Sequence, residues 1–98
     1  MKNISKNYNY NYIFLFYDIK EKRVNKVFKI CKKYLNHWQK SVFRGAITNA
    51  EIIKLEYELK KVINIEEDFI SIIKIVNFKT IGETNIGTIQ KNTENIFL

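Results

Sequence analysis

Hydrophobic and polar residues follow two different periods along the chain, and each change of period predicts a change of secondary structure. Residues 12–19 hold seven apolar side chains and one acid, Asp18, and their β-branched and aromatic character predicts a strand. Because apolar and polar residues do not alternate there, we expect both faces of this strand to be covered, as at the centre of a sheet. From residue 22 to residue 35 apolar side chains recur every three or four positions, which predicts an amphipathic helix.

The middle of the chain predicts a second extended region and a second helix. Residues 37–47 read as extended and fit either one kinked strand or a short arm followed by a longer strand, and we favour a break near residues 40–41. Thr48 and Glu51 have the T-x-x-E spacing of a capping box, in which two side chains satisfy free N–H groups at the start of a helix. The apolar stripe behind this box predicts a helix that ends at about residue 63.

The last third of the chain begins with another β-prone run, residues 68–76. Its polar members Ser71 and Lys74 are predicted to lie on opposite faces of a strand. Residues 79–95 are mostly polar and are followed by three apolar residues, 96–98. We expect these last residues to form a short strand that adds to the edge of a sheet.

The order of these elements predicts an α+β fold. Right-handed crossovers close them into a ferredoxin-like βαββαβ sandwich with an extra C-terminal strand and both helices on one face of the sheet. Since residues 12–17 are apolar on both faces, we expect a second copy of the same sheet to cover the other face and form a homodimer. We divide the chain into a mobile leader (residues 1–11), a ferredoxin-like domain (residues 12–78) and a C-terminal loop with a dimer-swapped edge strand (residues 79–98).

Positive charge is concentrated in the first half of the chain. The formal net charge is +7 at pH 7, from 17 Lys and Arg against 10 Asp and Glu. Residues 1–50 hold eleven basic and two acidic residues, whereas residues 51–98 hold six and eight. Residues 22–33 include six basic residues and no acidic residue. Such a field is what phosphate-backbone binding needs, and the alternative is a solvated helix face.

The length and the cysteine and histidine counts exclude several classes of function. One domain of 98 residues builds a modest core, which leaves little room for a deep pocket around a large organic cofactor. Cys31 is the single cysteine, which excludes an intrachain disulfide and predicts a core thiol on the apolar stripe. His37 is the single histidine, which excludes a histidine cluster within one chain and predicts a loop or strand-edge residue. With no run of 18 apolar residues and no signal-peptide pattern, we expect a cytoplasmic protein with no membrane partner.

Asp18 is the leading candidate for chemistry because it ends the most hydrophobic segment of the chain. A carboxylate is costly there unless it is paired or bound to a metal. One alternative is that Asp18 caps the turn into the helix at Lys22. The other is a catalytic or metal-binding role, for which a single carboxylate is too few ligands. A two-fold axis passing nearby would supply a second Asp18. The acidic run Glu66-Glu67-Asp68 is expected to be a solvated turn.

Two sequence blocks resemble a known family. Tyr17-Asp18-Ile19 ends the first strand, Arg23 opens the helix, and Gln39-Lys40-Ser41-Val42-Phe43-Arg44-Gly45 precedes the Thr-capped helix. At this separation in so short a chain, these blocks resemble the CRISPR-associated Cas-two family, small proteins that partner the adaptation integrase. The likeness covers roughly residues 12–76, and the apolar residues 96–98 fit the family's final strand.

The resemblance implies a ferredoxin-like homodimer in which Asp18 of each chain faces the dimer axis and the two carboxylates bind Mg²⁺ or Mn²⁺. It implies a metal-dependent endonuclease acting on single-stranded RNA or double-stranded DNA. It also implies the central dimer of the spacer-acquisition complex, which holds DNA between integrase dimers. In such a centre the metal polarises a phosphodiester oxygen and lowers the pKa of a bound water.

Residue by residue, the resemblance carries a nucleic-acid contact to Arg23 and a role in shaping the strand near the site to Tyr17, Ser41 and Phe43. The chain departs from the family in a longer leader and in Arg44, which stands where many members have an acid and makes the rim more basic. The residues that we expect to bind nucleic acid are Lys20, Lys22, Arg23, Lys26 and Arg44.

The function that we expect is therefore a DNA-binding CRISPR adaptation protein with endonuclease (endoribonuclease or DNase) potential centred on Asp18. Two alternatives remain. In the first, the same dimer is a non-catalytic DNA-binding scaffold and Asp18 is structural. In the second, the fold serves a toxin-like endoribonuclease that has no integrase partner.

Overall fold

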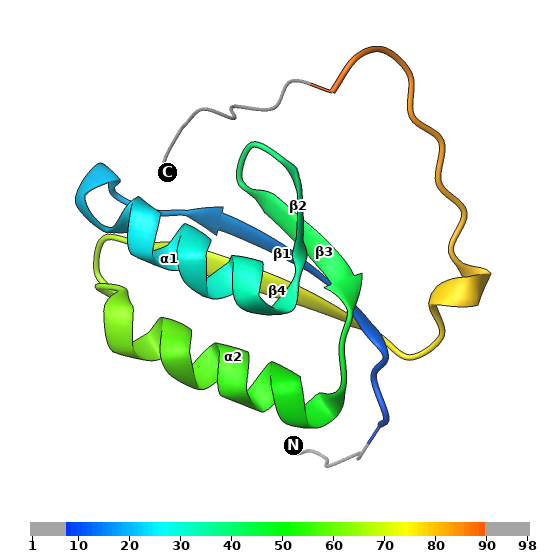
Figure 1. Cartoon of the computed structure of the whole chain (residues 1–98), viewed down its shortest axis with the longest axis horizontal. Helices are drawn as coiled ribbons and strands as arrows, with labels where there is room; N and C mark the ends of the chain where they lie inside the picture. The colour runs from blue at the N-terminus through cyan, green and yellow to red at the C-terminus, as the bar shows by residue number, and fades with distance from the viewer. Residues whose placement is uncertain (1–7, 90–98) are drawn as a thin grey trace.

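The elements follow one another in the order strand, helix, two strands, helix and strand (Figure 1). The computed structural model of the protein describes residues 8–89. The elements are β1 (Tyr12–Asp18), α1 (Glu21–Tyr34), β2 (Asn36–Gln39), β3 (Val42–Ala46), α2 (Asn49–Val62), β4 (Phe69–Ile75) and the short 3-10 helix η1 (Phe78–Thr80). Helix α1 is offset by one residue from its predicted bounds, and the strand break predicted at residues 40–41 is confirmed by the turn between β2 and β3.

The four strands form one antiparallel sheet in the order β2-β3-β1-β4. Both helices cover the same face of this sheet (Figure 1). The ferredoxin-like α+β fold and the central position of β1 are thereby confirmed. Within residues 8–89 no helix is long and apolar enough to cross a bilayer.

The core lies between the sheet and the two helices. Alternate residues of β1 point into it, and Ile13 and Leu15 are fully buried there. Cys31 of α1 is also fully buried, which confirms the predicted core thiol. Burial raises the pKa of this thiol to about 12. His37 packs on Phe43 from the edge strand β2, as expected of a strand-edge residue.

The other face of the sheet carries no helix, and we call it the open face. In an antiparallel pair, residues directly opposite one another lie on the same face. On β1 and β4 this register pairs Phe14 with Ile73 and Asp18 with Phe69. Phe16, Phe69 and Ile73 are 40%, 64% and 50% exposed. Residues 8–89 therefore leave the part of this second apolar face around Phe16 uncovered.

The predicted start of α2 is confirmed in detail. The Thr48 hydroxyl accepts a hydrogen bond from the Glu51 N–H, and the Glu51 carboxylate accepts one from the Thr48 N–H. These two bonds satisfy N–H groups that no helical carbonyl can reach. The helix ends within one residue of its predicted end, with Ile63 as C-cap.

Residues 8–11 are held against the domain, although the sequence assigned them to a mobile leader. The Tyr10 N–H donates to the Asn49 side chain at the start of α2, and the Asn49 amide donates to the Tyr8 carbonyl. The Asn11 N–H donates to Ile75 of β4. The folded domain therefore includes these four residues, while residues 1–7 lie outside the described part of the chain.

The segment after β4 turns back over one end of the open face. Phe78 of η1 stacks on Tyr12 with ring centroids 3.7 Å apart, and Glu83 pairs with Arg44 of β3 at 2.7 Å. The end of the open face that carries Phe16 and Asp18 lies at the opposite end of β1 from Tyr12. The edge strand expected at residues 96–98 lies outside the described residues and stays a prediction.

Candidate metal centre and nucleic-acid interface

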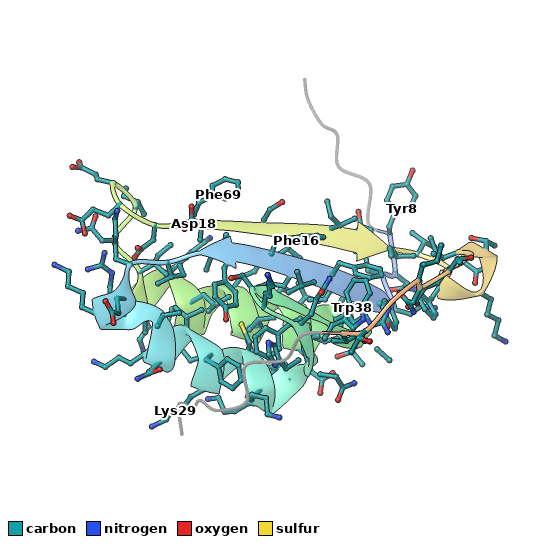
Figure 2. All side chains as sticks on the ribbon, turned by 90° about the horizontal axis from the view of Figure 1, so that it is seen from above. Tyr8, Phe16, Asp18, Lys29, Trp38 and Phe69 are labelled. Carbon is teal, nitrogen blue, oxygen red and sulfur yellow. The ribbon has the colours of Figure 1, made fainter. Side chains whose placement is uncertain are left out.

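Asp18 lies at the last position of β1, on the open face. It stands opposite Phe69 in the β1–β4 register, and Figure 2 shows the two side by side, with Phe69 turned away from the helices. The residue is exposed, and its carboxylate makes no hydrogen bond or ion pair with any other residue between 8 and 89. An acid at the edge of an apolar face, with no partner among the described residues, is available to bind a cation.

The alternative role of Asp18 as a helix cap is wrong. Helix α1 begins after Lys20, which is its N-cap residue, and no side chain caps it. The carboxylate that reaches the Lys20 N–H comes instead from Asp68, at 2.9 Å. The start of α1 is therefore fixed by an acid that lies 48 residues away in the sequence.

Asp68 is the site residue that the sequence did not reveal. Its side chain is 0% exposed and its oxygens also accept hydrogen bonds from Arg23 Nε at 2.6 Å and from the Asn64 N–H at 2.9 Å. Glu67 pairs with the same guanidinium at 2.7 Å. The expectation of a solvated acidic turn is thus corrected for Asp68. A signal was present, because Asp68 directly opens an apolar run as Asp18 closes one, and a carboxylate there needs partners.

The Arg23 guanidinium holds the pKa of the Asp68 carboxyl far below its usual range, and the N–H donors of Asn64 and Lys20 add to this shift. In return, Asp68 first and then Glu67 raise the pKa of Arg23. The Arg23 side chain is only 16% exposed. The two carboxylates take the Nε and Nη2 donors of this guanidinium and offset its charge, which leaves only Nη1 to reach a phosphate group. The structure therefore gives Arg23 a structural role that the sequence did not predict.

The lysines of α1 are spread over the helix surface and do not converge on Asp18. Lys22, Lys26, Lys29 and Lys32 are exposed, whereas Lys33 pairs with Glu58 of α2 at 2.5 Å. Figure 2 shows Lys29 on the helix layer, on the other side of the sheet from Phe69. Lys20 is exposed at the loop between these two layers, beside Asp18 in the chain. The exposed lysines of α1 and the Asp18 carboxylate therefore lie on different faces of the sheet.

Arg44 belongs to the open face but is already engaged. Its guanidinium lies 4.2 Å from the centre of the Trp38 ring and pairs with Glu83. The register places it opposite Phe14, nearer the covered end of the face than Asp18. The predicted basic rim is thus partly neutralised within the chain.

Tyr17, Ser41 and Phe43 support the end of β1 from the helix side. Tyr17 and Phe43 are buried, with ring centroids 6.1 Å apart, and burial raises the pKa of Tyr17 to about 12. The Tyr17 N–H donates to the Ser41 carbonyl at 3.1 Å. These contacts fix the backbone directly before Asp18.

The described part of one chain brings few metal ligands together. Between residues 8 and 89 there is no group of three or more His, Cys, Asp or Glu side chains in reach of one point. Asp18 supplies hard carboxylate oxygen, which suits Mg²⁺ or Mn²⁺. The donor type therefore fits a divalent cation, and a second chain that contributes its own Asp18 would raise the number of carboxylate donors to two.

Comparison with known proteins places this chain in a family. A sequence profile described as "CRISPR associated protein Cas2" matches residues 11–80. The chain belongs to the Cas2 family. A relative named "CRISPR-associated endoribonuclease Cas2 3" from Thermodesulfovibrio yellowstonii is 42% identical over 84 residues, which cover 86% of this chain and 96% of that protein. A "CRISPR-associated endoribonuclease Cas2" from Methanosarcina acetivorans is 36% identical over 84 residues, covering 86% and 97%.

A solved Cas2 structure agrees with the fold described above. The structure titled "Crystal structure of cas2" matches with a TM-score of 0.75 and 32% identity, covering 89% of this chain and 98% of that one. The resemblance drawn from the Asp18 and Ser41–Phe43 blocks is thereby confirmed at the level of the family. The Cas2 relatives named here carry the name of an endoribonuclease.

Proposed function

We propose that this Cas2 chain acts as a homodimer that binds nucleic acid and cleaves phosphodiester bonds with a divalent cation held between two Asp18 carboxylates. The observation that carries the proposal is the placement of Asp18, an acid without a partner among residues 8–89, on the exposed apolar face of the sheet. A face with Phe16, Phe69 and Ile73 exposed is the kind that a second protein surface covers. A two-fold contact through it would bring the same side chains together from both chains.

Mg²⁺ or Mn²⁺ bound by the two Asp18 side chains would polarise a phosphodiester oxygen and activate a water molecule. The chain itself supplies the support. The Tyr17–Ser41 hydrogen bond fixes the backbone before Asp18, and Phe16 and Phe69 lie beside Asp18 on the open face, where a second sheet packed on them would exclude water. A carboxylate held in place in an apolar setting binds a cation more strongly than one in water.

Nucleic acid would bind through the exposed lysines. Lys20, Lys22 and Lys26 are exposed at the Asp18 end of the molecule, and they can contact phosphates without reading the sequence of bases. Arg44 can join them through the donors that Glu83 does not occupy, although Glu83 offsets its charge. Because these contacts are with the phosphate backbone, binding is expected to weaken steeply as the salt concentration rises.

The cellular role proposed for this dimer is spacer acquisition. It would hold double-stranded DNA while an integrase subunit of the CRISPR system inserts it. Membership of the Cas2 family and the concentration of positive charge in residues 1–50 support this role. Single-stranded RNA is the other proposed substrate, because the Cas2 relatives are named endoribonucleases.

The test of the metal centre is the Asp18→Asn variant. The amide keeps the shape of the side chain and removes its charge, so cleavage with Mg²⁺ is expected to fall by at least about 100-fold while dimerisation and nucleic-acid affinity stay nearly unchanged. Glu21→Gln, an exposed acid three residues along, is the matched control and is expected to cleave at the wild-type rate. Cleavage that survives Asp18→Asn in protein purified identically ends the catalytic proposal.

Mixing wild type with Asp18→Asn tests whether both carboxylates are needed. If one cation sits between two chains, a mixed dimer is inactive. After subunit exchange in an equal mixture, random pairing leaves about a quarter of the dimers with two Asp18 side chains, and the activity should fall accordingly. An activity that follows the amount of wild-type chain alone would show that each chain works by itself.

A non-catalytic scaffold is the second candidate. It is favoured by the absence, within residues 8–89, of any cluster of metal-binding side chains in one chain. Here the same dimer would bind DNA and the integrase, and Asp18 would serve the dimer contact. Spacer acquisition in cells that carry Asp18→Asn separates the two candidates, because retained acquisition with lost cleavage favours the scaffold.

A further inference from the structure

The carboxylate of Asp68 joins three segments at the Asp18 end of the sheet. It accepts hydrogen bonds from the Lys20 N–H before α1, from the Asn64 N–H after α2, and from Nε and Nη2 of Arg23 at 2.6 and 3.1 Å. The side chain is completely buried. A buried carboxylate with four donors is one of the most tightly fixed groups that a protein can build.

The segments that Asp68 joins are those that flank Asp18. Lys20 follows Asp18 by two residues along the chain. Asp68 itself precedes Phe69, the residue that pairs with Asp18 across the sheet. Since α1 has no side-chain cap of its own, the Asp68 carboxylate fixes the start of that helix and the loop that leads into it from β1.

We infer that Arg23 and Asp68 act together as a positioning pair, which we call the Arg23–Asp68 clamp, for the Asp18 carboxylate. The clamp holds the backbone on both sides of Asp18, so that two Asp18 side chains meet in the geometry that a divalent cation requires. This inference rests on the proposed metal centre and extends it to two residues that do not touch the metal. In this inference the role of Arg23 is to bind Asp68, and Arg23 is not one of the residues that contact nucleic acid.

Because a metal centre requires precise placement of its ligands, the Arg23–Asp68 clamp is expected to affect metal affinity and activity. Supporting residues must hold the reacting groups within about 0.5 Å of the working position. Changing a residue that only orients a metal ligand lowers metal affinity or activity by about 10–100-fold. A loosened β1–α1 loop therefore affects the cation first and the phosphate contacts of the lysines little.

The chain offers a matched control within the same cluster. Glu67 also pairs with Arg23, but its side chain is 42% exposed and its carboxylate makes no hydrogen bond with Lys20 or Asn64. The Glu67→Gln variant removes the negative charge of the carboxylate beside Arg23 and leaves all four hydrogen bonds of Asp68 in place.

The experiment compares Arg23→Gln, Asp68→Asn, the double variant and Glu67→Gln as full-length proteins. For the first two we expect kcat to fall about 10–100-fold, weaker Mn²⁺ binding by electron paramagnetic resonance, and nucleic-acid affinity within about 2-fold of wild type. The double variant should be no worse than the more damaging single one, because the two residues act as a unit. Glu67→Gln should remain close to wild type in all three measurements.

Loss of folding is separated from loss of positioning by a second variant. Arg23→Lys keeps the charge and can donate one hydrogen bond to Asp68, so we expect its kcat between those of wild type and Arg23→Gln. All assays are run well below the unfolding midpoint of each variant. Weakened nucleic-acid binding in Arg23→Gln but not in Asp68→Asn overturns the inference, as do effects that multiply in the double variant.

The failure of the clamp and the failure of the metal centre give different results. If Asp18→Asn still cleaves, the proposed metal centre is wrong. If Asp18→Asn is inactive while Arg23→Gln and Asp68→Asn keep the wild-type kcat and Mn²⁺ affinity, the metal centre stands and the clamp alone is refuted.

Discussion

At the scale of single residues, the two aspartates at one end of the sheet illustrate two fates of a carboxylate beside a hydrophobic core. The Asp68 carboxylate is buried and accepts hydrogen bonds from four donors. The Asp18 carboxylate is exposed and makes no hydrogen bond or ion pair within residues 8–89. A buried carboxylate without partners would cost several kcal/mol, so the hydrogen bonds of Asp68 are needed for the stability of the fold. The exposed Asp18 carboxylate leaves a charge available for a ligand.

The depressed pKa of Asp68 predicts a specific pH dependence of stability. Arg23 lowers the pKa of this carboxyl in the folded state below its value of about 3.9 in the unfolded chain, so the unfolded state binds more protons in acid. The stabilisation is therefore fully present above about pH 5 and is lost as the pH falls toward the folded pKa. We expect the difference in free energy of unfolding between wild type and Asp68→Asn to be constant from about pH 7 to 5 and to shrink below about pH 4.

Urea unfolding at fixed protein concentration and at several pH values measures this difference. Glu66→Gln corrects for the removal of one negative charge from the same loop, because the Glu66 carboxylate makes no hydrogen bond or ion pair within residues 8–89. A wild-type advantage over Asp68→Asn that is the same at pH 3 as at pH 7 would contradict the role of the ion pair.

At the scale of elements, local sequence signals located almost every boundary. The change from a β-prone run to a 3.6-residue period separated β1 from α1, and the capping box located the start of α2. These signals are local because they depend on hydrogen bonds and packing within a few residues. The contacts of Asp68 with Lys20 and Arg23 span more than 40 residues, so no local pattern could reveal them.

The turn between β2 and β3 was located although residues 40–41 include no glycine, proline, asparagine or aspartate. Lys40 adopts a φ of 37°, a left-handed conformation that usually favours glycine or asparagine. The sequence could therefore locate the break from the apolar pattern around it and could not predict this conformation. The adjacent Ser41 carbonyl accepts the Tyr17 N–H, which ties the turn to the end of β1.

The capping box predicts a measurable contribution to stability. Thr48→Ala removes the hydroxyl that accepts the Glu51 N–H, and should lower the free energy of unfolding by about 1 kcal/mol, within a range of about 0.5–2 kcal/mol. Thr48→Ser keeps a hydroxyl and is expected to lose much less. The midpoints of urea unfolding at equal protein concentration test this, and a Thr48→Ala protein as stable as Thr48→Ser would show that the cap contributes little.

At the scale of the whole molecule, the chain separates its properties onto two faces. The helix layer carries the exposed lysines of α1, and the open face carries exposed aromatic residues and Asp18 (Figure 2). The sequence predicted both surfaces, from the charge distribution and from the apolar residues on both sides of β1. It could not predict that Glu83 and Phe78 cover one end of the open face, because those contacts depend on the path of an irregular segment.

The open face predicts a dimer that one substitution at the exposed Asp18 end of this face should separate. Phe69 is 64% exposed in one chain, so Phe69→Lys should fold normally and yet place a charge against the partner sheet. We expect wild type to sediment as a dimer and Phe69→Lys as a single chain, with a loss of Mg²⁺-dependent cleavage because the two Asp18 carboxylates no longer meet.

Ile65→Lys is the control for this dimer test, since Ile65 is 82% exposed in the loop before β4 and off the open face, and it should stay dimeric. Far-ultraviolet circular dichroism checks that each variant is folded. A wild-type protein that sediments as a single chain at working concentration, or a Phe69→Lys protein that remains dimeric, would mean that the two chains do not meet through this face and that Asp18 acts without a second copy beside it.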